Sequence, residues 1–153
     1  MLEQAQHVLS VETRGAGFTD LTRRVTAWLG AVGARDGLLT LFVRHTSASL
    51  TIQENADPDV LRDLEETLEK LAPRGVRYHH DIEGPDDMPA HIKSMLTATS
   101  LGVPVAAGRP VLGTWQATYL VEHRDRPHKR EVVLHFVGTR ASPAGGKDGA
   151  PGT

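Results

Sequence analysis

The chain has 153 residues, which is enough for one domain that buries roughly 70% of the surface of its unfolded chain. Its 17 basic and 19 acidic residues give a formal charge of −2, and this balance provides no electrostatic basis for binding nucleic acid or an anionic membrane. The chain has no cysteine, which excludes disulfides, thiolate ligands and cysteine nucleophiles, so any metal must be held by imidazole, carboxylate or water.

Six segments have the composition of strands. They are rich in apolar and β-branched residues, with alternation in several of them. In chain order they are 7–13, 37–45, 48–54, 103–108, 114–124 and 131–138. The stretch "DRPHKR" separates the last two and is predicted to form a turn.

Three segments have the spacing of helices. The first is "FTDLTRRVTAWLGAVG" (18–33), for which Thr19 is the predicted N-cap. The second begins after Asp57, with Pro58 at the first helical position and a stripe of leucines that ends before Pro73. The third begins near Asp87, and its spacing predicts that Met88, Ile92, Met95 and Leu96 point inward.

Strands outnumber helices, and several neighbouring strands have hairpin spacing. We therefore predict a single α+β domain over residues 1–140, with a largely antiparallel sheet or sandwich and about three flanking helices. Residues 141–153 consist mostly of Gly, Pro, Ala and Ser and are predicted to form a disordered tail. The chain has no apolar run of bilayer length and no signal-peptide pattern, so we expect a cytoplasmic protein without membrane contact.

The stretch "YHHDIEGPDDMPAHIKS" (78–94) collects imidazoles and carboxylates in a segment that has no packing reason to hold them. Its His91 falls in the first turn of the third predicted helix, where the helix dipole favours the neutral ring that binds metals. His80 lies in the preceding loop. His45 ends the inward face of a predicted strand and faces a hydroxyl-rich turn. For each residue a structural role, such as a bonded core or loop histidine, is the alternative.

His123 ends another predicted strand, and its position favours a structural histidine at the rim of a sheet. The other four histidines have ordinary explanations on strand faces or in charged turns. No local spacing such as H-E-x-x-H joins any of the eight into a metal-binding motif.

Three longer motifs resemble the YjbQ-type family, whose members are often labelled secondary thiamine-phosphate synthases. They are "HTSASLTIQENADPDV" (45–60), "EGPDDMPAHIKSML" (83–96) and "GRPVLGTWQATYLVEHR" (108–124), and the resemblance extends from about Gln4 to Gly138. It implies a compact α+β homotrimer with a polar pocket near a subunit interface. The family label implies the joining of a pyrimidine pyrophosphate to a thiazole phosphate.

The resemblance also supports these positions as site residues, and their chemistry and predicted placement assign the roles. His45, His80 and His91 are the predicted ligands of a divalent metal, with zinc preferred and magnesium as the alternative for a pyrophosphate substrate. The predicted catalytic groups are Glu83, Asp87 and Lys93, and the groups predicted to bind a small phosphorylated metabolite are Thr46, Ser47, Thr114 and Gln116.

Two classes of function remain open from the sequence. The first is a metal-dependent enzyme with a histidine-lined pocket, either with low thiamine-phosphate synthase activity or acting as a metal-assisted hydrolase. The second is a non-catalytic trimer that binds a metabolite or a metal.

Overall fold

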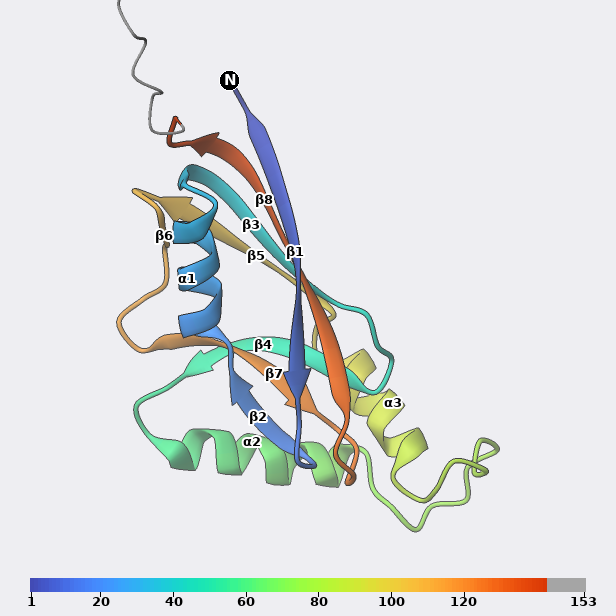
Figure 1. The fold of residues 1–153 in the computed structure, drawn as a ribbon. Coiled ribbons are helices and arrows are strands. Elements are labelled where there is room, and N and C mark those ends of the chain that lie inside the picture. Colours follow the sequence, from blue (N-terminus) through green and yellow to red (C-terminus); the bar gives the residue numbers. More distant parts are fainter. Residues whose placement is uncertain (143–153) are drawn as a thin grey trace, which may run out of the picture.

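The structure is a computed structural model, and it describes residues 1–142 as two antiparallel sheets and three helices (Figure 1). One sheet has five strands in the order β1-β8-β3-β5-β6, and the other has three in the order β2-β7-β4. The element bounds are β1 Glu3–Glu12, β2 Gly17–Asp20, α1 Thr22–Ala31, β3 Ala34–Val43, β4 Ala48–Glu54, α2 Pro58–Leu71, α3 Asp87–Leu96, β5 Ser100–Ala106, β6 Arg109–Pro110, β7 Gln116–Glu122 and β8 Lys129–Arg140.

The predicted α+β class with antiparallel strands and three helices is confirmed. The segment between the last two strands connects the two sheets, because β7 pairs with β2 and β4 whereas β8 pairs with β1 and β3. The predicted tail lies outside the described residues except for Ala141 and Ser142. Within the described part of the chain, no helix is long and apolar enough to cross a membrane.

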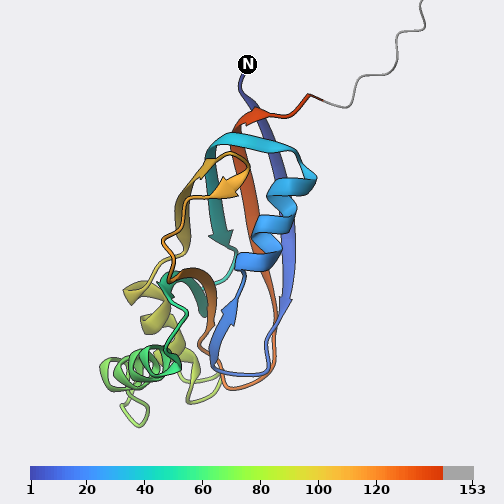
Figure 2. The same cartoon turned by 90° about the vertical axis from the view of Figure 1, so that its left-hand side faces the viewer.

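The hydrophobic core lies between α1 and the inner face of the five-stranded sheet. Figures 1 and 2 show α1 lying against this face. Val25 and Leu29 of α1 are fully buried there. Leu39 and Leu41 of β3 are buried against them, so the alternation predicted for this strand is confirmed.

The start of α1 differs from the prediction. Residues 17–20 form β2 and pair with β7, and the helix begins only at Thr22. Thr19 is therefore not an N-cap; the Thr22 amide donates instead to Asp20 Oδ1 at 2.8 Å. The physical reason is that Leu21 is fully buried and donates its amide to Thr118 of β7, which holds this segment in the sheet.

The second helix agrees with its local signals, whereas the third helix buries a different face from the predicted one. Asp57 caps α2 by accepting a hydrogen bond from the Asp59 amide at 2.9 Å. In α3, Met95 is 88% exposed and the buried positions include Lys93 and Ser94. Ser94 donates to the carbonyl oxygen of Ala48 in β4, so α3 packs on the small sheet through polar and small residues.

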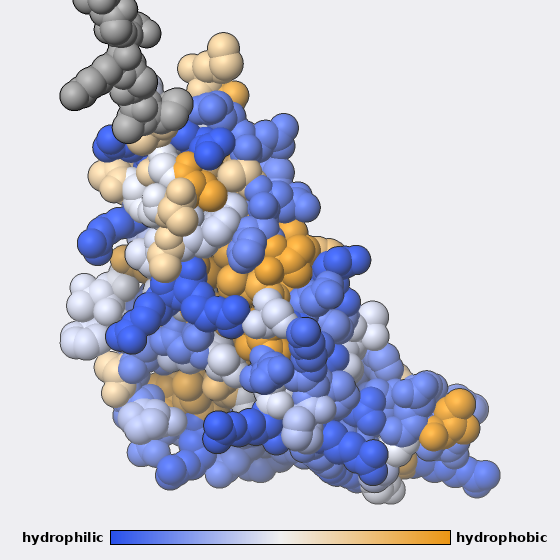
Figure 3. All heavy atoms as spheres, viewed as in Figure 1, coloured by the Kyte–Doolittle hydropathy of each residue, from blue (hydrophilic) through white to orange (hydrophobic). Residues whose placement is uncertain are grey.

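The helices α2 and α3 lie at the end of the molecule opposite the N-terminus (Figures 1 and 2). The loop that joins them, residues 72–86, projects beyond the two sheets, and Figure 3 shows an apolar group at its tip. Ile82 in this loop is 88% exposed. The loop also carries His80, so the fold places this histidine at the edge of the molecule.

Candidate metal centre at the start of α3

His80, Asp87 and His91 form a cluster in which one possible ligand atom from each residue lies within 4.8 Å of the other two. Asp87 and His91 are one helical turn apart on α3, so their side chains share a face of the helix. The loop brings His80 Nε2 to 2.6 Å from Asp87 Oδ2, and His91 Nε2 lies 3.2 Å from the same oxygen. Two imidazoles therefore converge on one carboxylate oxygen.

The tautomer of a neutral His91 follows from its second contact. Its Nδ1 lies 2.9 Å from the carbonyl oxygen of Thr46. Because a carbonyl only accepts hydrogen bonds, Nδ1 carries the proton and donates. The Nε2 of the neutral ring then has a lone pair that faces Asp87 Oδ2, which also only accepts. Two acceptors at 3.2 Å repel each other unless a cation lies between them, either a second proton or a metal ion.

The donor set fits a zinc ion. Zinc binds imidazole nitrogen and carboxylate oxygen at about 2.0–2.1 Å, so tetrahedral ligand atoms lie roughly 3.3 Å apart. The His91–Asp87 separation of 3.2 Å agrees with this value. The His80–Asp87 separation of 2.6 Å is that of a hydrogen bond and must widen on metal binding. His80 is on an exposed loop, which lets it move.

Asp87 is held in its charged form despite its burial. Burial raises the pKa of this carboxyl, but the hydrogen bond from His80 and the charge of Arg124 outweigh it and keep the pKa below its ordinary value. Arg124 Nη1 donates to Asp87 Oδ1 at 2.6 Å. The cluster therefore contains a permanent anion beside two imidazoles, as a cation site requires.

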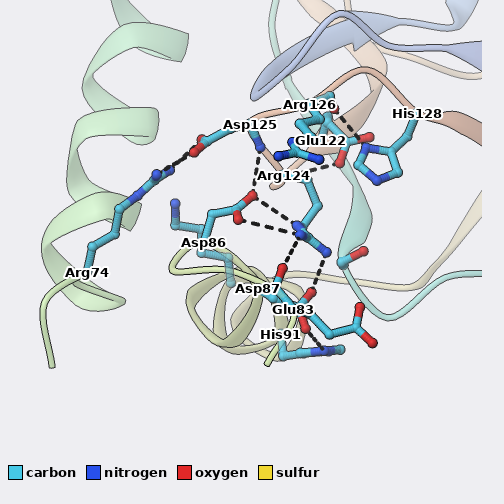
Figure 4. A network of polar contacts seen from close by, with 12 residues as sticks. Arg74, Glu83, Asp86, Asp87, His91, Glu122, Arg124, Asp125, Arg126 and His128 are labelled. Atoms are coloured by element: carbon cyan, nitrogen blue, oxygen red, sulfur yellow. Dashed lines mark hydrogen bonds and ion pairs between the residues drawn. The ribbon is translucent and has the colours of Figure 1, made fainter. Parts of the chain in front are cut away.

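A network of ion pairs surrounds the cluster (Figure 4). Arg124, which follows β7, also donates from Nε to Asp86 Oδ2 at 2.9 Å. Burial raises the pKa of Asp86, but Arg124 and the Asp125 amide together lower it to about 2. Arg74, at the start of the loop, forms a bidentate ion pair with Asp125. Both ends of the His80 loop are thus tied to Arg124 and Asp125, the second and third residues after the end of β7.

Beside the cluster, the surface is hollowed by a cavity of about 420 Å³. The loop 75–85 and Met88 line it, and His80 is on its wall. A cavity of this size is within the range of small-molecule sites. Of the three residues of the cluster, His80 is the one that lines this cavity.

The structure brings together two of the three predicted metal ligands. His45 is not in the cluster; its Nε2 accepts a hydrogen bond from the Glu131 amide at 2.8 Å. Burial and the charge of Arg130 lower the pKa of His45, which keeps its ring neutral. The third ligand atom of the cluster belongs to Asp87, which the sequence indicated as a catalytic group.

The other two predicted catalytic groups lie apart from the cluster. The side chain of Glu83 is exposed. Glu83 contacts the ion-pair network through its backbone oxygen, which accepts a hydrogen bond from Arg124 Nη2 at 2.9 Å. Lys93 is two residues after His91 and so lies on another face of α3, where it is buried and paired with Glu69 of α2. Lys93 lines a narrow cleft together with His123.

The residues predicted to bind the metabolite are at two separate places. Thr46 and Ser47 are in the loop after β3: Thr46 supplies its carbonyl to His91, and Ser47 Oγ accepts from Arg130 at 3.0 Å. Thr114 and Gln116 are exposed at the other end of β7 from the cluster, where Gln116 Oε1 accepts from the Gly113 amide. Within a single chain, Thr46 and Ser47 therefore do not share a pocket with Thr114 and Gln116.

Sequence reasoning missed the arginines that organise this end of the molecule. Arg130 of β8 and Glu122 of β7 form a buried ion pair that joins the two sheets, with Nη2–Oε1 at 2.5 Å. Arg124 was within the quoted motif that ends in "EHR", but no pattern linked it to Asp86 and Asp87, about 40 residues earlier. Charged residues at strand ends usually face solvent, so their types and spacing carry no signal of burial.

His123 has the structural position that its strand suggested. It is 3% exposed, and its Nε2 lies 2.8 Å from Ser49 Oγ. Burial and the nearby charge of Lys93 lower its pKa to about 4. The ring therefore remains neutral at physiological pH and stays outside the metal cluster.

Residues 7–139 match the family described as "UPF0047 protein YjbQ-like". The chain belongs to this family. It is 52% identical over 136 residues to UPF0047 protein sll1880 of Synechocystis, covering 88% of this chain and 92% of the relative. It is 42% identical to UPF0047 protein YjbQ of Salmonella typhimurium over 87% of this chain and 97% of that protein. The family resemblance predicted from the motifs is confirmed.

Solved structures of family members have the same fold. The conserved hypothetical protein TT1486 from Thermus thermophilus is 42% identical and superposes with a TM-score of 0.74, covering 84% of this chain and 97% of that one. A YbjQ-like protein of unknown function from Sulfolobus solfataricus is 20% identical with a TM-score of 0.83, covering 91% and 100% of the two chains, which supports the fold alone. The names of these proteins mention no activity, metal or substrate.

Proposed function

We propose that this UPF0047 protein is a metal-dependent enzyme that binds a divalent ion, zinc in preference to magnesium, between His80, Asp87 and His91. The contact that carries the proposal is the one between His91 Nε2 and Asp87 Oδ2 at 3.2 Å. Because Nδ1 donates its hydrogen bond to Thr46, Nε2 of the neutral His91 ring can only accept. Nε2 and Asp87 Oδ2 therefore repel each other, and a cation bound between them is attracted to both atoms.

The remaining contacts support a catalytic rather than a closed structural site. Structural zinc sites have four protein ligands, whereas catalytic sites have three and keep a position open. Two imidazoles and one carboxylate oxygen supply three ligand atoms here. A bound ion would polarise a phosphate or pyrophosphate oxygen and stabilise charge on a leaving group.

The proposed substrate is a small phosphorylated metabolite that occupies the cavity beside His80. This choice rests on the family resemblance, and the size and position of the cavity are compatible with it. Thiamine-phosphate formation from a pyrimidine pyrophosphate and a thiazole phosphate is the reaction to test first. Hydrolysis of the pyrophosphate requires the same polarisation of a phosphate oxygen and should be measured in the same assay.

Elemental analysis of protein purified without a metal-binding tag and then loaded with zinc tests the metal. We expect about one zinc per chain in wild type, and a strong loss in His80→Ala, Asp87→Ala and His91→Ala. His128→Ala serves as the control because this half-buried ring lies outside the cluster and bonds only the Arg126 carbonyl in the described part of the chain. Wild-type protein that binds no zinc contradicts the proposal. Metal binding without turnover of the two substrates assigns the protein to the non-catalytic class.

A further inference from the structure

The two oxygens of the Asp87 carboxylate have different surroundings. Oδ1 accepts a hydrogen bond from Arg124 Nη1 at 2.6 Å. Oδ2 faces the two imidazoles, 2.6 Å from His80 Nε2 and 3.2 Å from His91 Nε2. Asp87 itself is 4% exposed, so neither oxygen is free to turn toward bulk water. Only one of the two oxygens is therefore available to an ion in the cluster.

Arg124 is fixed by further contacts with the segment 83–86. Its Nε donates to Asp86 Oδ2 at 2.9 Å, and its Nη2 donates to the Glu83 carbonyl at 2.9 Å. Figure 4 shows the guanidinium directed at these three acceptors from the end of β7. Because the planar guanidinium is rigid, these bonds set the position of Nη1 and with it the rotation of the Asp87 carboxylate.

We infer that Arg124 is a positioning residue that keeps Asp87 a one-oxygen ligand and so keeps a coordination position open for a substrate oxygen. The inference rests on the proposed metal site. Carboxylates bind metals through one oxygen or through both. With Oδ1 held by Arg124, two imidazoles and Oδ2 leave the fourth position of zinc open. With Oδ1 released, Asp87 binds through both oxygens and fills that position.

The ligand that this open position takes is an anionic oxygen, and inorganic phosphate is a simple probe for it. Cobalt(II) replaces zinc as the spectroscopic ion, because its visible absorption is stronger with four ligands than with five or six. Phosphate that binds the ion in the full-length protein changes this spectrum, so its dissociation constant is measured by titration without any assay of activity.

Three variants separate positioning from a general structural effect. Arg124→Gln removes the donor to Asp87 Oδ1. Arg124→Lys keeps the charge and one donor. Asp125→Asn keeps Arg124 and all of its side-chain contacts but weakens the neighbouring ion pair with Arg74, which makes it the matched control for loss of stability. Thermal unfolding of each cobalt-loaded variant confirms that it is folded at the temperature of the titration.

For Arg124→Gln we expect a changed cobalt spectrum before phosphate is added and phosphate affinity about tenfold or more below that of wild type, the size of effect typical of residues that orient metal ligands. Arg124→Lys should recover part of the affinity, and Asp125→Asn should resemble wild type.

If Arg124→Gln loads cobalt with the spectrum and phosphate affinity of wild type, the positioning role is wrong and the metal site stands. If Asp125→Asn loses as much phosphate affinity as Arg124→Gln, the network has only a structural role. If wild type takes up no cobalt, the proposed function itself fails, and the inference with it.

Discussion

His91 Nδ1 donates to the carbonyl oxygen of Thr46 across a separation of 45 residues, at 2.9 Å. The loop after β3 therefore determines which nitrogen of this imidazole is available at the cluster. This contact gives the loop a role in the site through its backbone, whereas the predicted ligand in the same loop, His45, is bonded to Glu131. A ligand set of two imidazoles and one carboxylate follows, in place of three imidazoles.

The first prediction separates these two ligand sets. Asp87→Ala should weaken zinc binding as strongly as His80→Ala, by more than about 100-fold, because loss of a direct ligand exceeds the effect of losing a residue that only orients one. His45→Ala should retain zinc with less than about a tenfold change. Competition with a chromophoric chelator measures each affinity. Strong loss of zinc in His45→Ala together with its retention in Asp87→Ala would favour the three-histidine site.

The second prediction concerns the pH dependence of stability. The folded-state pKa of His123 is lowered to about 4, whereas the unfolded imidazole takes up a proton below its ordinary value of about 6.5. Between these values the unfolded chain binds the extra proton, so stability should decline as the pH falls from about 6.5 to 4, by on the order of 3 kcal/mol for this group. Urea unfolding at several pH values measures it.

The variant His123→Gln should flatten the decline in this pH range, because it removes the titrating ring while keeping a polar group near Ser49. His128→Gln, a change at a half-buried histidine in the connection between β7 and β8, is the matched control and should preserve the wild-type pH profile. An unchanged pH profile in His123→Gln would show that other groups cause the decline.

The third prediction concerns the buried ion pair between the sheets. Glu122 and Arg130 have side chains that are 1% and 5% exposed, so removing one charge leaves the other buried without its partner. Glu122→Gln should lower the free energy of unfolding by about 3–5 kcal/mol. Arg44 and Glu131 form the comparison pair, at 56% and 46% exposure, and Glu131→Gln should cost at most about 1 kcal/mol. Equal losses in the two variants would contradict the role assigned to burial.

The fourth prediction is the homotrimer implied by the family resemblance. The outward face of the five-stranded sheet carries an apolar row in which Val8, Val133 and Phe42 are side by side in the register. A second row joins Val137 to Leu38, and both of these residues are partly exposed. Exposed apolar patches of this kind mark interaction sites, and here we expect further copies of the chain to cover them.

Light scattering after size exclusion should give roughly 50 kDa, three times the chain mass of 16.6 kDa. Phe42→Asp should shift the protein toward the monomer, because it places a charge in the middle of the patch. Val111→Asp introduces the same charge at an exposed valine outside these rows and should leave the mass unchanged. A monomer at every protein concentration would rule out the assembly.

The sequence by itself determined the elements whose signals are local. Alternation in β3 predicted the burial of Leu39 and Leu41, and the Asp57 cap followed by a proline predicted the start of α2, because these patterns depend only on the period of the backbone and on neighbouring groups. Long motifs also identified the family, since many residue types in a fixed order are specific without any knowledge of their contacts.

Only the tertiary structure decided which of those residues meet. The fold brought Arg124 to Asp87, 37 residues apart in the sequence, and Thr46 to His91, 45 residues apart. Over such sequence separations the periodicity of helices and strands gives no information about contacts. It also turned α3 so that Lys93 is buried and Met95 is exposed, opposite to the apolar pattern. The reason is that α3 meets β4 through its small and polar residues, as in the hydrogen bond from Ser94 to Ala48, and the apolar spacing of one helix carries no information about the surface on which it will pack.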